Sequence, residues 1–336
     1  MTQDLNTALA TPPVMASTLP DPIASVVIPS YYHEAYLEAA IDSVLNQTRS
    51  DIELIVVDDG SKDRSRRILA GLRDCRVKVV LQENAGAHNA INRGMAMTRA
   101  PYISILNSDD VFTPDRLEIM VAEMQEQDAD LACSWIQQMD HVGKPGPIKK
   151  GWTSQLPSWA RTLPKVKVRK SDAFAYELLR SNFISTTSNM VISRRIYEKV
   201  GGMRNLRFAH DWDFAFRAAS HGRCLMVPLN LMRYRTHGTN TISSNRSWMM
   251  FEICWMLAVH FDAMADQLSH LNRSDLARSH YGALDPTYDA LKEALDRAGT
   301  QESRDSFAEK LLNDESARAP YIDMITDRLN HTRHES

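Results

Sequence analysis

Apolar residues follow two different periods along the first third of the chain. Short runs rich in valine and isoleucine predict buried strands at 24–29, 52–57, 77–81 and 102–106. Between the first two runs, apolar residues recur at helical spacing over 36–45. Strands that alternate with helices predict βαβ units. We therefore expect an α/β fold with a doubly wound, mostly parallel sheet.

The same pattern divides the chain into three parts. Residues 1–22 are rich in Thr, Ala and Pro and lack the basic and apolar regions of a secretory signal, so we expect a disordered leader. The α/β pattern covers 23–245, with a first half over about 23–115 and a second half over about 116–245. The remaining residues, 246–336, follow a helical pattern and predict a helical C-terminal region.

Composition and charge exclude several classes of protein. The 336 residues carry a net charge of −3, so the chain as a whole gives no electrostatic reason to bind nucleic acid. No apolar run reaches the roughly 18 residues of a membrane span. The four cysteines are far apart and show no CxxC spacing, which is typical of free thiols in a reducing cytoplasm.

Two acidic pairs stand where predicted strands end. Asp58 and Asp59 follow the second strand, and Asp109 and Asp110 follow the fourth. Ligands of parallel sheets bind beyond the carboxyl ends of the strands. Carboxylates at this edge suit a base, a ribose or a divalent cation such as Mg²⁺ or Mn²⁺. Such residues also commonly cap the next helix, so the pairs alone do not decide between these roles.

A loop between the third strand and the next helix is rich in small and amide residues. Asn84 and Gly86 lie in it, and Asn89 follows at the start of the predicted helix. These residues suit a loop that approaches a polar ligand, although they also suit a turn with a helix cap.

The second half of the α/β pattern contains one further carboxylate of interest. Asp211 lies beside Trp212 at the predicted start of a helix, where aromatic bulk would raise its pKa and suit it as a general base. A helix N-cap is the alternative. His237 follows a predicted strand, and a lone histidine is more often structural than catalytic.

The motifs together resemble those of the family 2 glycosyltransferases, which have the GT-A fold. The resemblance covers about 24–245, and the matching stretches are SVVIPSYYHEAYLEAAIDSVLNQT, ELIVVDDGSKDRS, NAGAHNAINRGM, YISILNSDDVFTPDRL, FAHDWDFAFRAASHG and LMRYRTHG. It implies an inverting transfer of a sugar from a nucleotide-sugar. The first half would then bind the donor and the second half the acceptor.

The resemblance also assigns roles to individual residues. Asp211 matches the catalytic base, and Asp109 and His237 match residues that hold Mn²⁺ or Mg²⁺ near the diphosphate. The expected donor-binding set, with the two asparagines added from their loop, is Pro29, Tyr31, Glu34, Asp58, Asn84, Asn89, Asp109 and Asp110.

Two positions depart from the family pattern. Asn107 stands where the metal motif commonly begins with Asp, which would weaken the metal or leave Asp109 as its main protein ligand. His210 stands where Glu commonly precedes the base, and the lower negative charge would tend to reduce the pKa of Asp211.

The expected activity is transfer from a nucleotide-sugar, most commonly a UDP-sugar, to a hydroxyl of a glycan or lipid-linked acceptor in cell-surface polysaccharide synthesis. One alternative is a noncatalytic nucleotide-sugar-binding scaffold, which only Asn107 favours. Another is a sugar-nucleotide pyrophosphorylase, but the first strand is not followed by a glycine-rich basic loop.

Two segments predict contact with a membrane surface. Residues 149–170 carry seven basic residues, two tryptophans and no acid, and 248–261 is apolar except for Glu252 and His260. We therefore expect a cytoplasmic protein that visits the inner leaflet. For the first segment the alternatives are contact with an anionic lipid-linked acceptor and a solvated loop. For the second they are a helix packed on the catalytic domain or between two copies of the chain.

Overall fold

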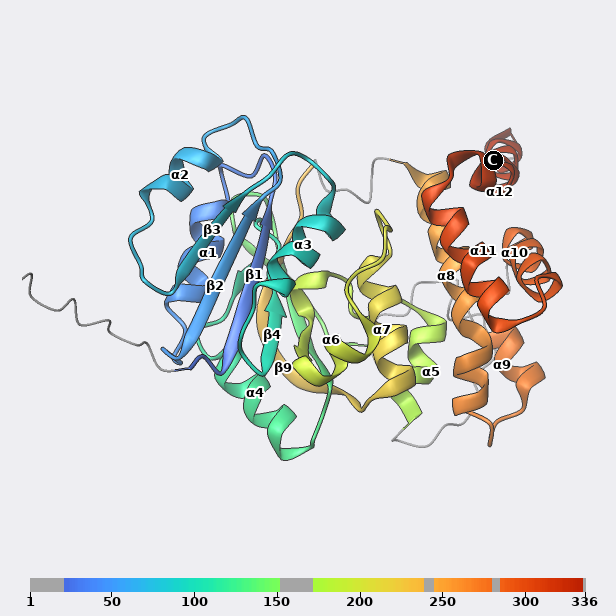
Figure 1. The fold of residues 1–336 in the computed structure, drawn as a ribbon, viewed down its shortest axis with the longest axis horizontal. Helices are drawn as coiled ribbons and strands as arrows, with labels where there is room; N and C mark the ends of the chain where they lie inside the picture. Colours follow the sequence, from blue (N-terminus) through green and yellow to red (C-terminus); the bar gives the residue numbers. More distant parts are fainter. Residues whose placement is uncertain (1–20, 152–171, 239–244, 280–284, 335–336) are drawn as a thin grey trace, which may run out of the picture.

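The computed structural model describes residues 21–151, 172–238, 245–279 and 285–334. Within these ranges the chain forms a nine-stranded sheet with helices on its faces, and a group of C-terminal helices stands beside it (Figure 1). The expected leader lies outside the described residues except for its last two positions. The basic segment lies outside them from Trp152 onward.

The observed elements reproduce the alternation that the sequence predicts. The strands are β1 (Ala24–Ser30), β2 (Ile52–Asp58), β3 (Val77–Leu81), β4 (Tyr102–Ile105), β5 (Val111–Phe112), β6 (Leu131–Met139), β7 (Pro145–Lys149), β8 (Val191–Ser193) and β9 (Cys224–Arg235). The helices of the α/β part are α1 (Leu37–Leu45), α2 (Ser65–Gly71), α3 (Ala87–Ala96), α4 (Arg116–Glu126), α5 (Ala173–Arg180), the 3₁₀ helix η4 (Thr187–Asn189), α6 (Arg194–Val200) and α7 (His210–His221). The C-terminal helices are α8 (Arg246–Gln267), α9 (Arg273–Ser279), α10 (Pro286–Arg297), α11 (Gln301–Asn313) and α12 (Glu315–His334).

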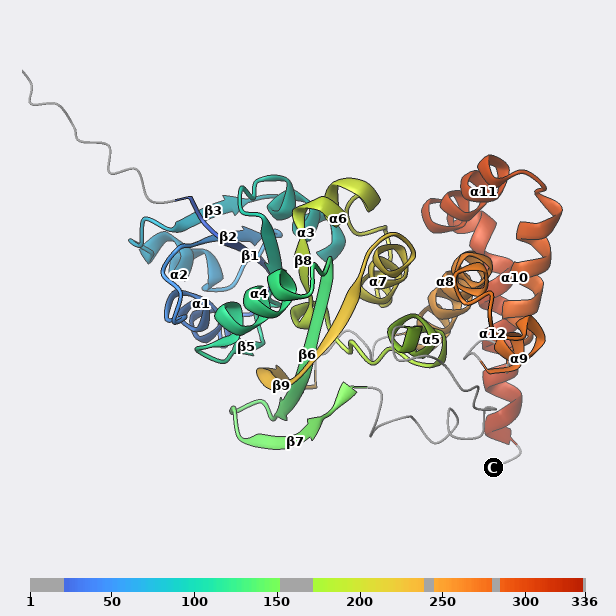
Figure 2. The same ribbon diagram turned by 90° about the horizontal axis from the view of Figure 1, so that it is seen from below.

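The sheet has a parallel half and a mixed half. Its order is β3-β2-β1-β4-β8-β6-β9-β5, with β7 paired to β6. The first four of these strands are parallel, as the βαβ pattern predicts. β8 is antiparallel to both its neighbours, whereas β6 and β9 run parallel and lie side by side along much of their length (Figure 2). The α/β fold is therefore confirmed.

Helices cover both faces of the parallel half. Val26 and Ile28 of β1 belong to the apolar cluster that includes α1 and α4, whereas Val27 faces α3. Gly94 permits close contact between α3 and β1, because a Cβ atom there would lie 2.3 Å from a methyl carbon of Val27. The carboxyl ends of β1, β2 and β4 consequently lie together at one edge of the sheet.

The C-terminal region shares its core with the α/β part. Phe214 and Phe216 of α7 belong to the same buried cluster as Phe251, Trp255 and Leu257 of α8. Among the described helices, α8 alone is long and apolar enough to cross a membrane, but 61% of its most apolar stretch is buried inside the protein. The structure thus supports the alternative of a helix packed on the catalytic domain, and membrane contact of 248–261 stays a prediction that this burial does not favour.

A buried group of charges fastens α7 to α8. Asp213 of α7 has no exposed surface and accepts hydrogen bonds from Arg217 at 2.9 Å, Arg204 at 3.1 Å and His260 of α8 at 2.8 Å. Burial alone would raise the pKa of this carboxyl, but Arg217, His260 and Arg204 together hold it below its usual value. The charged form of Asp213 therefore stabilises the folded chain.

We expect Asp213→Asn to destabilise the protein by about 3–5 kcal/mol, because it leaves buried cations without their anion. Urea-induced unfolding measures this free energy, and Asp305→Asn, at an exposed position of α11, should lie within about 0.5 kcal/mol of wild type.

Since the pKa of Asp213 is lowered in the folded state, its contribution to stability is complete above the ordinary aspartate pKa of about 3.9 and declines as the pH falls below it. An Asp213→Asn variant as stable as the control would contradict the role assigned to this cluster.

Candidate active site

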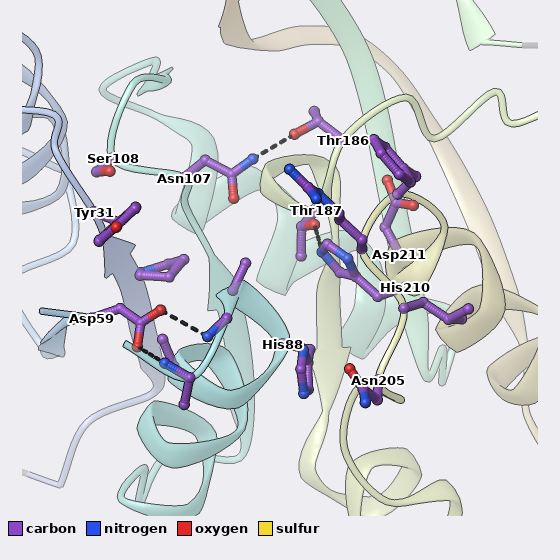
Figure 3. Close-up of a pocket in the computed structure, with 18 of the residues that line it drawn as sticks. Tyr31, Asp59, His88, Asn107, Ser108, Thr186, Thr187, Asn205, His210 and Asp211 are labelled. Carbon is purple, nitrogen blue, oxygen red and sulfur yellow. Dashed lines mark hydrogen bonds between the residues drawn. The ribbon is translucent and has the colours of Figure 1, made fainter. Parts of the chain in front are cut away.

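A pocket of about 980 Å³ lies between the sheet edge and the C-terminal helices. One wall comes from the loops that follow β1, β2, β3 and β4, with Tyr31, Asp59 and Ser108 among its residues (Figure 3). Across the pocket lie Thr187 and Asp211, which come from the turn before β8 and from the start of α7. The pocket therefore lies at the edge of the sheet that the acidic pairs predict.

Some of the predicted donor-binding residues line this pocket and others do not. Pro29, Tyr31 and Asn84 lie in its wall. Glu34 lies outside the lining, where its carboxylate accepts a hydrogen bond from the backbone N–H of Arg64 at 2.6 Å. Asn89 is exposed on α3 and is also outside the lining.

The two neighbouring acids after β2 have different surroundings. Asp58 lies beneath the surface, where one oxygen accepts hydrogen bonds from Arg66 at 2.9 Å and from the backbone N–H of Ser61 at 3.1 Å. Asp59 lines the pocket instead, and its carboxylate accepts from the backbone N–H groups of Ala85 at 2.8 Å and Gly86 at 3.0 Å. Of this pair, Asp59 therefore lines the pocket and Asp58 does not, whereas the sequence interpretation favours Asp58.

A glycine allows Asp59 to reach the loop after β3. Gly60 has φ +87°, and a Cβ atom there would lie 2.9 Å from the backbone nitrogen of Asn84. A side chain at this position would be strained and would separate the two loops. Gly60 and the Asp59 hydrogen bonds thus hold the loop that contains Asn84 against the end of β2.

Asp110 lies below the pocket and supports its wall. Its side chain is completely buried and accepts hydrogen bonds from the Ser188 hydroxyl at 2.6 Å and from the backbone N–H of Arg235 at 2.9 Å. Burial, with the nearby charge of Asp109, raises the pKa of Asp110 well above its usual value. Asp110 is not part of the pocket lining, so its geometry is that of a supporting residue rather than a ligand contact.

Asp109 projects into the pocket beside two histidines. His237 Nε2 lies 2.9 Å from Oδ2 of Asp109, and the potential ligand atoms of His33, Asp109 and His237 all lie within 4.8 Å of one another. Two imidazoles and one carboxylate are suitable ligands for a divalent transition metal. The pairing of Asp109 with His237 follows the sequence interpretation. His33, which comes two residues after Tyr31, is an addition that the motifs did not single out.

Asp211 lies in the first turn of α7 and lines the pocket. Oδ1 accepts hydrogen bonds from the backbone N–H of Trp212 at 2.7 Å and from Asn182 at 3.4 Å. Burial raises the pKa of Asp211, and its electrostatic interaction with the adjacent His210 opposes that shift. A buried carboxylate with a raised pKa at a pocket wall is chemically suited to accept a proton.

The wall next to Asp211 depends on a carboxylate from α8. Glu252 accepts hydrogen bonds from the backbone N–H groups of Arg207 and Phe208 at 2.7 Å and of Ala209 at 3.1 Å. The indole of Trp248 donates to the same carboxylate at 2.9 Å. Glu252 therefore fixes the segment that leads directly into α7, and no motif in the sequence marks it for this role.

Comparison with known proteins agrees with this geometry. The family model described as glycosyl transferase family 2 matches residues 25–201. The chain belongs to this family. A relative described as an uncharacterised glycosyltransferase of Nostoc sp. is 31% identical over 228 residues, which are 66% of this chain and 67% of the relative. EpsJ of Bacillus subtilis, described in the same words, is 30% identical over 222 residues, which are 64% of this chain and 61% of that protein.

A solved structure extends the likeness to the fold of nearly the whole glycosyltransferase. TarS of S. aureus, residues 1–349 in complex with UDP-GlcNAc, aligns over 93% of this chain and 92% of its own, with a TM-score of 0.58 and 18% identity. The GT-A fold that the motifs predict is thereby confirmed. Membership of the family also removes the pyrophosphorylase alternative.

The two departures from the family pattern have structural partners in this glycosyltransferase. Asn107 donates a hydrogen bond through Nδ2 to the Thr186 hydroxyl at 3.0 Å, and its backbone N–H donates to Ser188 at 2.9 Å (Figure 3). His210 Nε2 lies 2.9 Å from the Thr187 hydroxyl. Both residues therefore help to fasten the segment before β8 to the pocket.

We expect Glu252→Ala to loosen the wall next to the start of α7, because three backbone N–H groups lose their buried acceptor, at about 1–3 kcal/mol for each unpaired group. Hydrogen exchange of the amides at 207–209 should become at least about tenfold faster than in wild type. Glu252→Gln keeps one acceptor oxygen and should give a smaller increase. Unchanged exchange at these amides in Glu252→Ala would contradict the proposed support.

Proposed function

We propose that this protein is an inverting, metal-dependent glycosyltransferase that moves a sugar from a UDP-sugar to a hydroxyl of a glycan or lipid-linked acceptor. The observation that carries the proposal is the position of Asp211, a buried carboxylate that faces the same pocket as Tyr31, Asp59 and Asp109. UDP is proposed because TarS, which shares the fold, has been solved with UDP-GlcNAc and with UDP. Chondroitin synthase of Escherichia coli, 38% identical over 33% of this chain, supports a glycan acceptor.

Donor recognition is proposed for the wall formed by the loops after β1, β2 and β3. Tyr31 is 46% exposed and offers a ring to the nucleobase, next to Pro29. The carboxylate of Asp59 already accepts three hydrogen bonds, from Ala85, Gly86 and Gln82. Since a carboxylate has about four acceptor sites, one remains for the base. We therefore assign this contact to Asp59 in place of Asp58.

The cation is proposed to bind His33, Asp109 and His237. Their donor set of two imidazoles and one carboxylate favours Mn²⁺ over Mg²⁺, which prefers oxygen ligands. When bound, this ion would neutralise negative charge on the diphosphate leaving group. Asn107 is tied to Thr186 through its amide nitrogen, so Asp109 would be the main carboxylate ligand.

Asp211 performs the proton transfer in the proposed mechanism. Its carboxylate takes the proton of the acceptor hydroxyl as that oxygen forms a bond to the anomeric carbon of the sugar. The bond between this carbon and the nucleotide diphosphate breaks at the opposite face, and its electron pair leaves with the diphosphate. A single displacement needs one base and inverts the anomeric configuration.

We propose that this reaction takes place in the cytoplasm, as a step in the synthesis of a cell-surface polysaccharide. A cytoplasmic location is favoured by the four cysteines, which are all unpaired, as is typical of a reducing compartment. Contact of the basic segment with the inner leaflet and association of two copies through the C-terminal helices remain predictions.

We expect Asp211→Asn to lower the rate of sugar transfer by about 10²–10⁴-fold, because the acceptor hydroxyl loses its base. Binding of UDP, measured by calorimetry with Mn²⁺, should stay within about twofold of wild type, since the donor wall is unchanged. Because burial raises the pKa of Asp211, wild-type activity should fall on acidification at a pH above the ordinary aspartate range. Turnover above a tenth of the wild-type rate in Asp211→Asn would mean that another residue is the base.

We expect removal of any member of the proposed cation site to weaken Mn²⁺ binding about tenfold or more, because each supplies one ligand atom. His33→Ala, Asp109→Ala and His237→Ala test this by electron paramagnetic resonance titration of the full chain with Mn²⁺. His331→Ala, an exposed position on α12, is the control. If the Mn²⁺ affinity of His33→Ala equals that of the control, His33 is not a ligand.

A further inference from the structure

The pocket has a third wall, which the proposed donor site does not use. It comes from the C-terminal helices and includes Trp248 and Glu252 of α8, Leu312 of α11 and Arg318 of α12. Glu252 is engaged with the backbone at 207–209, as described above. The side chain with unused hydrogen-bonding capacity on this wall is that of Arg318.

Arg318 lies in the pocket wall and has no anionic partner among the described residues. Its Nη1 donates to the backbone carbonyl of Leu312 at 2.9 Å, whereas its Nε–H is buried and has no hydrogen-bond acceptor. Within the part of the chain that the structure describes, no carboxylate lies within 4.0 Å of this guanidinium. By contrast, Arg217, which is buried, pairs with Asp213 at 2.9 Å. An unpaired buried donor at a pocket wall is satisfied when a ligand supplies the acceptor.

Trp248 fixes the orientation of this guanidinium. The Arg318 carbon Cζ lies 4.6 Å from the centre of the Trp248 ring. The ring is held in turn by the hydrogen bond from its indole nitrogen to Glu252 at 2.9 Å. A planar guanidinium held in one orientation is suited to two parallel hydrogen bonds with a phosphate or a carboxylate.

The position of Arg318 favours the acceptor over the donor. The diphosphate of the donor is expected at the proposed cation site, which lies on the loops after β1, β4 and β9. Arg318 shares its wall with Glu252, which positions the residues that lead directly into His210 and Asp211. The group that Arg318 meets therefore belongs to the molecule whose hydroxyl Asp211 deprotonates.

We propose that Arg318, oriented by Trp248, forms an acceptor subsite for an anionic group, so that the acceptor is a sugar-containing molecule with a phosphate or a carboxylate near the reacting hydroxyl. This inference rests on the proposed function, because it uses Asp211 as the base. It assigns a substrate-binding role to the C-terminal helices in addition to their role in the core.

The test compares three monosaccharides that share the glucose ring and differ in charge, namely glucose 6-phosphate, glucuronate and glucose. Their binding to the full chain is measured by calorimetry in the presence of saturating UDP and Mn²⁺, which fill the donor site. We expect at least one of the two anionic sugars to bind about tenfold or more tightly than glucose. The arm that shows the preference identifies phosphate or carboxylate as the group recognised.

Two substitutions locate this preference. Arg318→Gln should reduce it to less than about twofold, whereas Arg297→Gln, on a 73% exposed side chain of α10 that pairs with Glu293, should preserve it. If Arg318→Gln does not fold, Arg318→Lys serves instead, because it keeps the charge but loses the two parallel hydrogen bonds and should bind the anionic sugar several-fold more weakly than wild type.

The proposed subsite would be contradicted if neither anionic sugar bound the UDP-loaded protein more tightly than glucose. It would also be contradicted if the Arg318 variants kept the wild-type preference for the anionic sugar. Failure of wild-type protein to bind UDP would instead overturn the proposed function, and the subsite with it. The two failures are therefore distinguished by the first titration.

Discussion

The carboxylate of Asp110 joins three segments that are far apart in the chain. It accepts hydrogen bonds from the hydroxyl of Ser188, in the turn before β8, and from the backbone of Arg235, at the end of β9. Arg235 in turn donates to the backbone carbonyl of Asp109 at 2.8 Å. The segment of Asp109 and Asp110 is consequently held against the turn before β8 and the end of β9, and the Asp109 carboxylate lies next to the His237 ring. The catalytic edge is thus organised in advance by contacts that lie beneath the surface.

The βαβ part of the fold could be read from the sequence because short apolar runs and helical periodicity alternate there without interruption. The finer geometry of the site could not. All seven residues of β2 are buried, so no alternation of polar and apolar positions shows which of Asp58 and Asp59 lines the pocket. His33 reaches the site because Tyr32 adopts φ +53°, a left-handed conformation that a tyrosine gives no reason to expect.

Helix α8 shows how one sequence pattern permits two structural interpretations. An apolar stretch such as 248–261 suits a membrane surface, but a helix that is apolar on all sides is also typical of a protein core. The two polar interruptions, Glu252 and His260, would have distinguished the readings. Each makes a buried hydrogen bond to the region of α7, which a helix lying on a lipid surface would not form.

Because α8 belongs to the core and to the pocket wall at once, the C-terminal region is not an exchangeable module. A chimera that joined residues 1–245 to the last helices of another family member would have to replace the contacts of Phe216 and Asp213 with α8 as well as the support at 207–209. Recombination between relatives is therefore expected to succeed where α7 and α8 are inherited together. The specificity of such an enzyme and its ability to fold would then evolve as one trait.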